Sequence, residues 1–318
     1  MITTIVESLT HAKKVALIAH IMPDGDTIGS CIALSYALES IGCETHLYCQ
    51  DPIPYNLCFL DDNGRFINVL PANPVNYDAI LALDCSDLDR MGEFRYLMES
   101  GWQTINIDHH ISNTNFAQMN YIDIEAAATC EIVYRLIEHM GIHMDISIAR
   151  ALYVGISTDT GNFAFNNTTS RTHCIAAKLV DIGVRPDEIS NKVYKDNSLS
   201  RMKLIAKVIQ SIKLYANGSI STIEITRNML SETGASQEES SGMVDYAKNI
   251  RGVELAILFK EQEDGQIKIS MRSKTTIDCN KLAQAFGGGG HARAAGCILD
   301  ASLHDTKVAV IKEAKKAF

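Results

Sequence analysis

The 318-residue sequence is long enough for two domains, since one domain usually takes about 150 residues. A hydrophobic content of 46% and a charged content of 21% are typical of globular proteins and exclude wholesale disorder. No apolar run approaches the roughly 18 residues of a membrane-spanning helix, and nothing like a cleavable signal follows Lys13 and Lys14, so we expect neither an exported nor a membrane protein. The nine cysteines are odd in number and lack a CxxC pair, which favours a reducing cytoplasm over a disulfide framework.

The net charge of −9 is unevenly distributed. Residues 1–185 hold 10 Lys+Arg against 22 Asp+Glu, a net of −12, whereas residues 186–318 hold 19 against 16, a net of +3. This division suggests that one half gathers cations and the other holds an anion, although independent surface drift in two domains would give the same totals. Because no basic stripe or Lys/Arg-rich helix appears, duplex nucleic acid is not an expected partner.

The first 186 residues alternate short apolar runs with helical periods. The expected strands are 15–20, 45–49, 78–86 and 103–110, and the expected helices are 27–42, roughly 89–100, 129–141, 145–161 and 170–183. This alternation predicts an α/β domain over residues 1–186 with a doubly wound, mostly parallel sheet. Such sheets bind ligands beyond the carboxyl ends of their strands.

The second part of the chain has a different pattern. Residues 187–212 are expected to form a polar linker helix, in one or two segments. Two hairpins follow, over 213–226 with Asn217-Gly218 in the turn and over 254–273 with Asp264-Gly265. Expected helices at 280–286 and near the C-terminus flank four consecutive glycines. Residues 213–318 are therefore expected to form a smaller α+β domain.

Polar residues stand where the expected strands end. His20 ends the first strand and opens the segment H-I-M-P-D-G-D, in which Pro23 and Gly25 allow Asp24 and Asp26 to point into one space. Further along the chain, Asp84 follows ILAL, Asp108, His109 and His110 follow INI, and Asp159 lies near the end of an apolar helix in STDTG.

Carboxylates gathered in this way repel each other and need a proton or a cation to neutralise them. Aspartates and histidines without cysteine suit Mn²⁺ or Mg²⁺, and the imidazoles favour Mn²⁺. Any single aspartate here is more often a helix cap or a turn former. His109 and His110 are adjacent on a strand and point to opposite faces, so at most one is an expected ligand. The prediction depends on four separate clusters that all follow apolar segments.

Several of these segments together resemble the DHH phosphoesterases. The motif H-x-x-P-D-G-D-x-x-G-S (20–30), the strand-terminal Asp84, D-H-H (108–110) and D-T-G-x-F (159–163) carry the resemblance. G-G-G-G-H-A-R-A-A-G (287–296) is similar to the glycine motif of the DHH-associated C-terminal domain. The motifs span nearly the whole chain, whose length is most similar to the NrnA-like branch of bifunctional oligoribonucleases (nanoRNases) and pAp phosphatases.

The resemblance implies a centre with two Mn²⁺ ions, for which Mg²⁺ could substitute. It assigns one ion to His20, Asp24 and Asp84, and the other to Asp26, Asp84, His109 and Asp159. Asp84 would bridge the two ions, and Asp159 is a candidate for sharing. Catalytic roles fall to Asp84, to Asp108, which would orient a ligand histidine or the strand end, and to His110, which would contact the scissile phosphate. Two such metals can activate a water that attacks phosphorus, with a sugar 3′-oxygen as leaving group.

The substrate contacts implied by the resemblance lie in the second half. They are Arg272, Ser273, Gly288, Gly289, Gly290, His291 and Arg293. Glycine amides and His291 would cradle a phosphate, and Arg272 can hold one through two hydrogen bonds. Taken alone, a glycine run is more often a flexible loop, Arg272 and Arg293 are more often solvated charges, and Ser273 is more often a cap.

The expected function is a cytoplasmic, Mn²⁺-dependent phosphoesterase with its active site in a cleft between the two domains. It would hydrolyse nanoRNA and pApA-like dinucleotides to mononucleotides and convert pAp to AMP. The alternatives are a manganese inorganic pyrophosphatase, whose C-terminal phosphate clamp is lysine-rich and built differently, and a non-catalytic protein that binds a cyclic dinucleotide. Family habit alone suggests a homodimer through the first domain; no membrane partner is expected.

Overall fold

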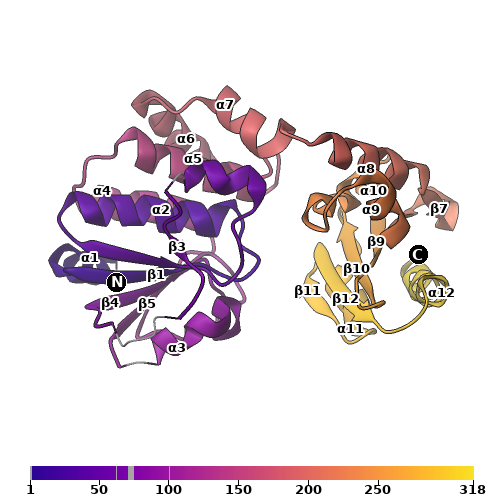
Figure 1. Ribbon diagram of the computed structural model, residues 1–318, viewed down its shortest axis with the longest axis horizontal. Helices are drawn as coiled ribbons and strands as arrows, with labels where there is room; N and C mark the ends of the chain where they lie inside the picture. The colour runs from indigo at the N-terminus through magenta and orange to yellow at the C-terminus, as the bar shows by residue number, and fades with distance from the viewer. Residues whose placement is uncertain (1, 62, 71–74, 100) are drawn as a thin grey trace. The chain divides into compact units, whose positions relative to one another are not determined.

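The computed structural model describes residues 2–61, 63–70, 75–99 and 101–318. The chain divides into two compact units, Met1–Asp196 and Asn197–Phe318, each with its own six-stranded sheet and its own hydrophobic core (Figure 1). No helix in these described ranges combines the length and the hydrophobicity that crossing a bilayer would require.

The sheet of the first unit consists of short, buried parallel strands. Its strands are β1 (Lys14–Ile18), β2 (Glu44–Tyr48), β3 (Phe66–Ile67), β4 (Ala79–Leu83), β5 (Gln103–Asp108) and β6 (Met119–Ile122), in the order β3-β2-β1-β4-β5-β6. Every pairing is parallel, which confirms the expected α/β class. The chain runs outward in one direction from β1 and in the other from β4, so the strand order reverses between these two neighbours. Ligands of open α/β sheets bind at such a switch point.

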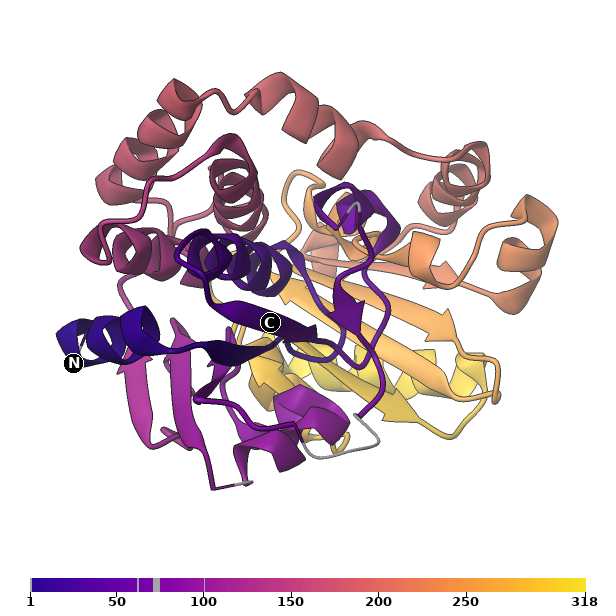
Figure 2. The same ribbon diagram turned by 60° about the vertical axis from the view of Figure 1, so that its left-hand side comes forward.

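Helices cover both faces of this sheet, but unequally. Most of them lie on one side: α1 (Ile2–His11), α2 (Gly25–Ser40) and α4 (Thr129–His139) are joined there by α5 (Ile146–Asp159) and α6 (Ser170–Ile182), which pack against α2 and α4 (Figure 2). The other face is covered by the 3₁₀ segment η2 (Leu88–Phe94) and the single-turn helix α3 (Arg95–Met98). Strand residues alternate between the two cores, with Leu17 and Leu81 on the α2 side and Ile18 and Ile80 on the α3 side.

The helix expected over roughly 89–100 is interrupted. Gly92 has φ 58°, and a Cβ there would lie 2.1 Å from Oε1 of Gln50, so the chain turns where a helix would have continued. The first unit also contains the 3₁₀ helix η1 (Tyr55–Leu60), the short helix α7 (Pro186–Ser190) and the π-helical turn η3 (Asn191–Lys195).

The second unit is built on a mixed sheet. Its strands are β7 (Lys213–Tyr215), β8 (Ile220–Ile225), β9 (Leu255–Glu261), β10 (Ile267–Ser273), β11 (Gly289–His291) and β12 (Ala294–Leu299), in the order β11-β12-β10-β9-β8-β7. The two expected hairpins are present as the antiparallel pairs β7–β8 and β9–β10, whereas β8 and β9 are parallel.

Two groups of helices cover the faces of this second sheet. Helices α11 (Cys279–Gln284) and α12 (Leu303–Ala314) pack on one face, while α8 (Leu199–Gln210), α9 (Arg227–Thr233) and α10 (Val244–Lys248) pack on the other. Residues 187–212 contribute to both units, because Val193 belongs to the first core and Leu204 and Val208 belong to the second.

Candidate metal centre

His20 lies directly beyond β1, at the switch point of the first sheet, and only 2% of it is exposed. Its Nδ1 lies 2.8 Å from the carbonyl oxygen of Ile21, to which it can donate. The opposite ring nitrogen, Nε2, lies 3.6 Å from Oδ1 of Asp24 and 3.4 Å from Oδ2 of Asp84. A backbone bond of this kind fixes the ring and directs the second nitrogen toward a ligand site.

Asp24 and Asp26 are fixed by backbone amides at the start of helices. Asp24 is the N-cap of α2 and accepts from the amides of Asp26 and Thr27 at 3.0 and 3.2 Å. Asp26 is fully buried, and its two oxygens accept from the amides of Thr129 and Cys130 at 2.6 and 2.8 Å. These amides open α4, so the positive end of that helix stabilises the Asp26 carboxylate.

Asp84 lies between the two histidines. It follows β4 with φ 63° and is 2% exposed. Its Oδ2 faces Nε2 of His20, and its Oδ1 lies 3.6 Å from Nε2 of His109 and accepts from Oγ1 of Thr129 at 2.9 Å. One carboxylate thus offers an oxygen to each side of the cluster, which is the position expected of a bridging ligand.

Asp108, the last residue of β5, and the two histidines that follow it have different contacts. Nδ1 of His109 lies 3.2 Å from the carbonyl oxygen of Ala126, while its Nε2 lies 3.4 Å from Asp159, 3.6 Å from Asp84 and 3.9 Å from Asp26. Asp108 is fully buried and receives the ring Nδ1 of His110 at 2.7 Å and the amide of His109 at 2.8 Å. Asp108 therefore orients the ring of His110 and the backbone at the strand end.

Asp159, the last residue of α5, also belongs to the cluster. Its Oδ2 lies 3.4 Å from Nε2 of His109. Its backbone carbonyl accepts from Nδ2 of Asn167 at 3.1 Å, and the same nitrogen lies 3.0 Å from the carbonyl of Ala127. Sequence reasoning missed Asn167 and Thr129. Only the position of Thr129 at the head of an amphipathic helix could have indicated a role near the strand ends.

The metal-ligand candidates form three overlapping groups whose ligand atoms lie within 4.8 Å of one another. They are His20–Asp24–Asp84, Asp26–His109–Asp159 and Asp84–His109–His110. All six residues expected as ligands are therefore gathered at one edge of the first sheet. His110 also falls within this distance, although its Nδ1 is engaged by Asp108.

The electrostatics of the cluster fit a divalent cation. Burial and the charge of Asp84 raise the pKa of Asp26 to about 7, and burial with the charge of Asp26 raises the pKa of Asp159 well above its usual range. Burial would lower the pKa of His109, but Asp84, Asp26 and Asp159 outweigh it and raise it to about 9. Carboxylates that resist ionisation beside imidazoles that hold protons indicate excess negative charge, which a bound cation would neutralise.

In the second unit, the expected substrate contacts gather at one corner of the sheet. Arg272 pairs with Ala294 across β10 and β12, and Ala294 pairs with His291 across β12 and β11. Directly paired residues share a face, so Arg272 and His291 project from the same side. Ser273 and Arg293 also hold the fold at this corner, because the hydroxyl of Ser273 and Nη1 of Arg293 donate to the carbonyl of Ile277 at 2.6 and 2.9 Å.

The glycine run follows α11 and leads into the edge strand β11, to which Gly289 and Gly290 belong. The amides of Gly287 and Gly288 donate to carbonyls of α11 at 3.1 and 2.9 Å. A Cβ on Gly288 would lie 2.2 Å from the oxygen of Gly296, and one on Gly290 would lie 2.6 Å from the oxygen of Ala294. The close approach of this segment to β12 therefore explains why positions 288 and 290 are glycines. At Gly289 a Cβ would fit, because its nearest neighbour, Oδ1 of Asn280, would lie 3.8 Å away.

Comparison with protein families gives two matches. Residues 14–156 match the DHH family N-terminal domain, and residues 217–318 match the DHHA1 domain. Between them, these matches include all the expected site residues except Asp159.

Among individual proteins, the chain is similar to a bifunctional oligoribonuclease and PAP phosphatase NrnA from Thermus thermophilus, with 31% identity over 280 residues, 88% of this chain and 82% of the relative. The Bacillus subtilis protein of the same name is 29% identical over 302 residues, 93% of this chain and 92% of the relative. The crystal structure of an exopolyphosphatase-related protein from Bacteroides fragilis has a TM-score of 0.91 at 28% identity, covering 99% of this chain and 94% of that one.

Proposed function

The chain belongs to the DHH family and carries a C-terminal DHHA1 domain, and from this membership we propose that it hydrolyses short oligoribonucleotides to mononucleotides and pAp to AMP. The single observation that supports this most strongly is the convergence of His20, Asp26, Asp84, His109 and Asp159 at the switch point of the sheet. Both reactions share one chemistry. Water attacks phosphorus, the bond to the 3′-oxygen breaks, and the 3′-hydroxyl leaves, so pApA gives two AMP and pAp gives AMP and phosphate.

The proposal assigns two divalent cations to the cluster. His20, Asp24 and Asp84 would hold one, and Asp26, Asp84, His109 and Asp159 the other. When bound, such cations lower the pKa of a coordinated water and neutralise charge on the attacked phosphate. Imidazole ligands favour Mn²⁺ over Mg²⁺.

The protein's own groups would orient the substrate. His110 is the proposed contact for the scissile phosphate, because Asp108 fixes its ring beside Asp84. Burial would lower the pKa of His110, but the hydrogen bond to Asp108 raises it overall, which favours a cationic ring next to an anionic substrate. Arg272 and His291, on one face of the second sheet, are the proposed contacts for a further substrate phosphate.

The experiment that tests this function is an end-point assay with four substrates: pAp, pApA, a five-nucleotide RNA and pyrophosphate. Each is incubated with the protein and Mn²⁺, and again with a chelator. The proposal requires AMP from pAp and pApA, mononucleotides from the RNA, and no product in the chelated arm. Survival of pAp, pApA and the RNA would refute it. Phosphate from pyrophosphate alone would identify a pyrophosphatase, and tight binding of a cyclic dinucleotide without product would identify a sensor.

We also propose the substrates, the cellular location and the assembly of the protein. The proposed partners are single-stranded RNAs of a few nucleotides, dinucleotides and pAp. The proposed location is the cytoplasm, and a homodimer is the proposed assembly. Sedimentation of the purified chain tests the last of these, with a monomeric mass as the contrary result.

A further inference from the structure

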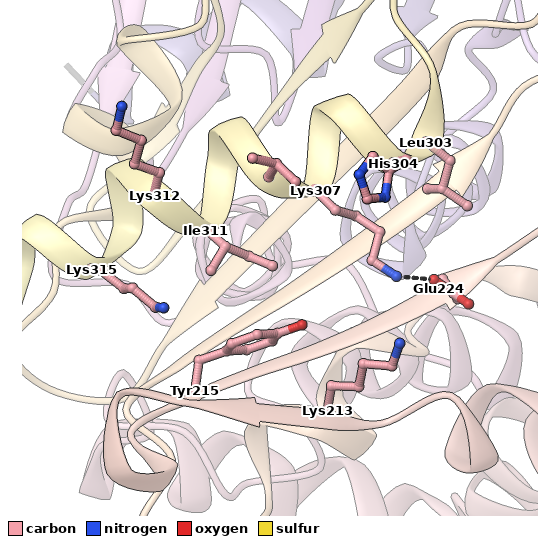
Figure 3. A pocket seen from close by; sticks show the side chains of 10 residues that line it. Lys213, Tyr215, Glu224, Leu303, His304, Lys307, Ile311, Lys312 and Lys315 are labelled. Atoms are coloured by element: carbon pink, nitrogen blue, oxygen red, sulfur yellow. Dashed lines mark hydrogen bonds and ion pairs between the residues drawn. The ribbon is translucent and has the colours of Figure 1, made fainter.

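A second candidate ligand site lies in the C-terminal unit, between the edge strand β7 and helix α12 (Figure 3). It is a groove of about 910 Å³, within the range of about 300–1,000 Å³ usual for ligand sites. Four of its lining residues are lysines: Lys213, Lys307, Lys312 and Lys315. Because β7 and the glycine strand β11 form opposite edges of the sheet, the groove is separate from the corner that holds Arg272 and His291.

The secondary structure explains why these side chains face one another. Lys213 and Tyr215 are two residues apart on β7 and therefore share a face. On α12, residues 304, 307, 308 and 311 recur at intervals of three or four and lie along one side of the helix, and Lys315 follows at the same spacing in the 3₁₀ turn just after it. In Figure 3, Lys307 on α12 and Lys315 in the turn just after it point toward β7, and Lys213 points back toward the helix.

The groove carries more positive than negative charge. Its one carboxylate, Glu224, is paired with Lys307. Across the part of the chain that the structure describes, no carboxylate lies within ion-pair distance of Lys213, Lys312 or Lys315. The ammonium group of Lys315 lies 5.6 Å from the ring centroid of Tyr215, so a cation and an aromatic face occur together at one end of the groove.

We propose that this groove binds the sugar–phosphate backbone of single-stranded RNA, through residues that take no part in the metal centre. Residues 304–315 extend for roughly 16 Å along α12 and into the turn after it, farther than the phosphate of one nucleotide can reach. Cations spaced along a groove with an aromatic ring are the combination that sequence-independent single-strand binders use. Inorganic polyphosphate would match the charges but would make no use of Tyr215. The site requires no cation and no turnover, so it goes beyond the proposed function.

The test measures RNA binding with the metal centre disabled. A fluorescently labelled five-nucleotide RNA is titrated with the full chain in EDTA, and fluorescence anisotropy gives Kd between 50 and 300 mM salt. The variant is K213A/K315A. The matched control is K203A/K268A, which removes two exposed lysines from the same unit, on α8 and β10, without touching the groove.

Loss of two phosphate contacts should reduce the slope of log Kd against log salt by about 1.4 and weaken binding roughly 25-fold at 0.1 M salt. The control should match the wild type. Equal weakening in both double variants, or no change in the groove variant, would overturn the proposal. So would equally strong competition from AMP, from polyphosphate of similar charge or from a poly-glutamate peptide. Because EDTA prevents hydrolysis, failure here is distinguishable from failure of the proposed enzyme activity.

Discussion

At the scale of single residues, His109 has the most consequential position in the metal centre. Its Nε2 faces three carboxylates within 3.9 Å, and the carbonyl of Ala126 holds its other nitrogen. Removing the ring leaves Asp26, Asp84 and Asp159 facing one another without the imidazole that the three carboxylates share.

We expect His109→Ala to lower bound Mn²⁺ and to reduce pAp hydrolysis by more than the roughly 100-fold typical of losing an outer partner of a metal ligand. The fold should persist, as measured by circular dichroism. Metal content by mass spectrometry and initial rates test this. His143→Ala is the control, since His143 is exposed and lies outside the centre. Equal metal stoichiometry in wild type and His109→Ala would exclude His109 as a ligand.

Arg272, in the second unit, is the proposed contact for a substrate phosphate. Arg272→Ala should raise KM for pAp about tenfold to a hundredfold, because a hydrogen-bonded contact between charged groups contributes about 1.5–3 kcal/mol. Metal content should not change. Lys268→Ala removes a charge from the same strand and should leave KM as it was. A change in kcat and metal content without a change in KM would contradict the assignment of Arg272 to substrate binding.

At the scale of elements, periodicity predicted the long segments well. The helices at 129–141, 145–161 and 170–183 and the four main strands of the first sheet are all present. Strands β3 and β6 were missed because edge strands of two and four residues carry almost no pattern. Helix α1 was missed as well.

The sequence also predicted part of the candidate site, because the carboxyl ends of parallel strands meet at a common edge of the sheet. His20, Asp84 and the D-H-H segment all follow apolar runs, and the structure brings them together. The supporting contacts from Thr129 and Asn167 could not be predicted from the sequence, because they depend on how α4 and the segment after α5 pack in three dimensions. The same holds for Ser273, whose hydroxyl turns inward to Ile277.

The glycine run permits a matched pair of substitutions. Gly288→Ala should destabilise the second unit by about 1–3 kcal/mol, because its Cβ would collide with the backbone of Gly296. Gly289→Ala should be tolerated, since its Cβ has room and its φ is not positive. Thermal unfolding distinguishes them: several degrees lost for the first and about none for the second. Equal losses would show that β11 and β12 do not approach as described.

Glu254 stabilises the turn after β10. It accepts from the amides of Thr275, Thr276 and Ile277 at 2.8, 2.6 and 3.2 Å. Burial would raise the pKa of Glu254, but these bonds lower it from 4.5 to about 2. A lowered carboxyl pKa adds stability that is fully present above pH 4.5 and is lost as the pH falls toward 2.

Glu254→Gln should therefore cost about 1–2 kcal/mol at pH 7, allowing for partial solvent screening, and almost nothing at pH 2. Urea unfolding of both proteins across this range measures the difference. Glu263→Gln, which changes an exposed glutamate of the β9–β10 turn, is the control and should show no such pH dependence. A constant difference at all pH values would mean that the charge of Glu254 contributes nothing.

At the scale of the whole molecule, the two units have separate cores, and the candidate ligands lie in the first unit alone. Mn²⁺ at 100 times its Kd should stabilise that unit by about 2.7 kcal/mol. Hydrogen exchange followed by mass spectrometry should show slower exchange in residues 1–196 and little change in 197–318. Equal protection in both units, or protection only in the second, would contradict the placement of the metal centre.

The left-handed backbone of Asp84 restricts which amino acids this position can accept. Glycine, asparagine and aspartate adopt such a conformation at low cost, and aspartate alone among them carries a negative charge. Glutamate would preserve the charge but would have to adopt an unfavourable main-chain geometry, and asparagine would preserve the geometry but lose the charge. Neither conservative replacement satisfies both demands, so main-chain geometry and charge together favour aspartate at position 84.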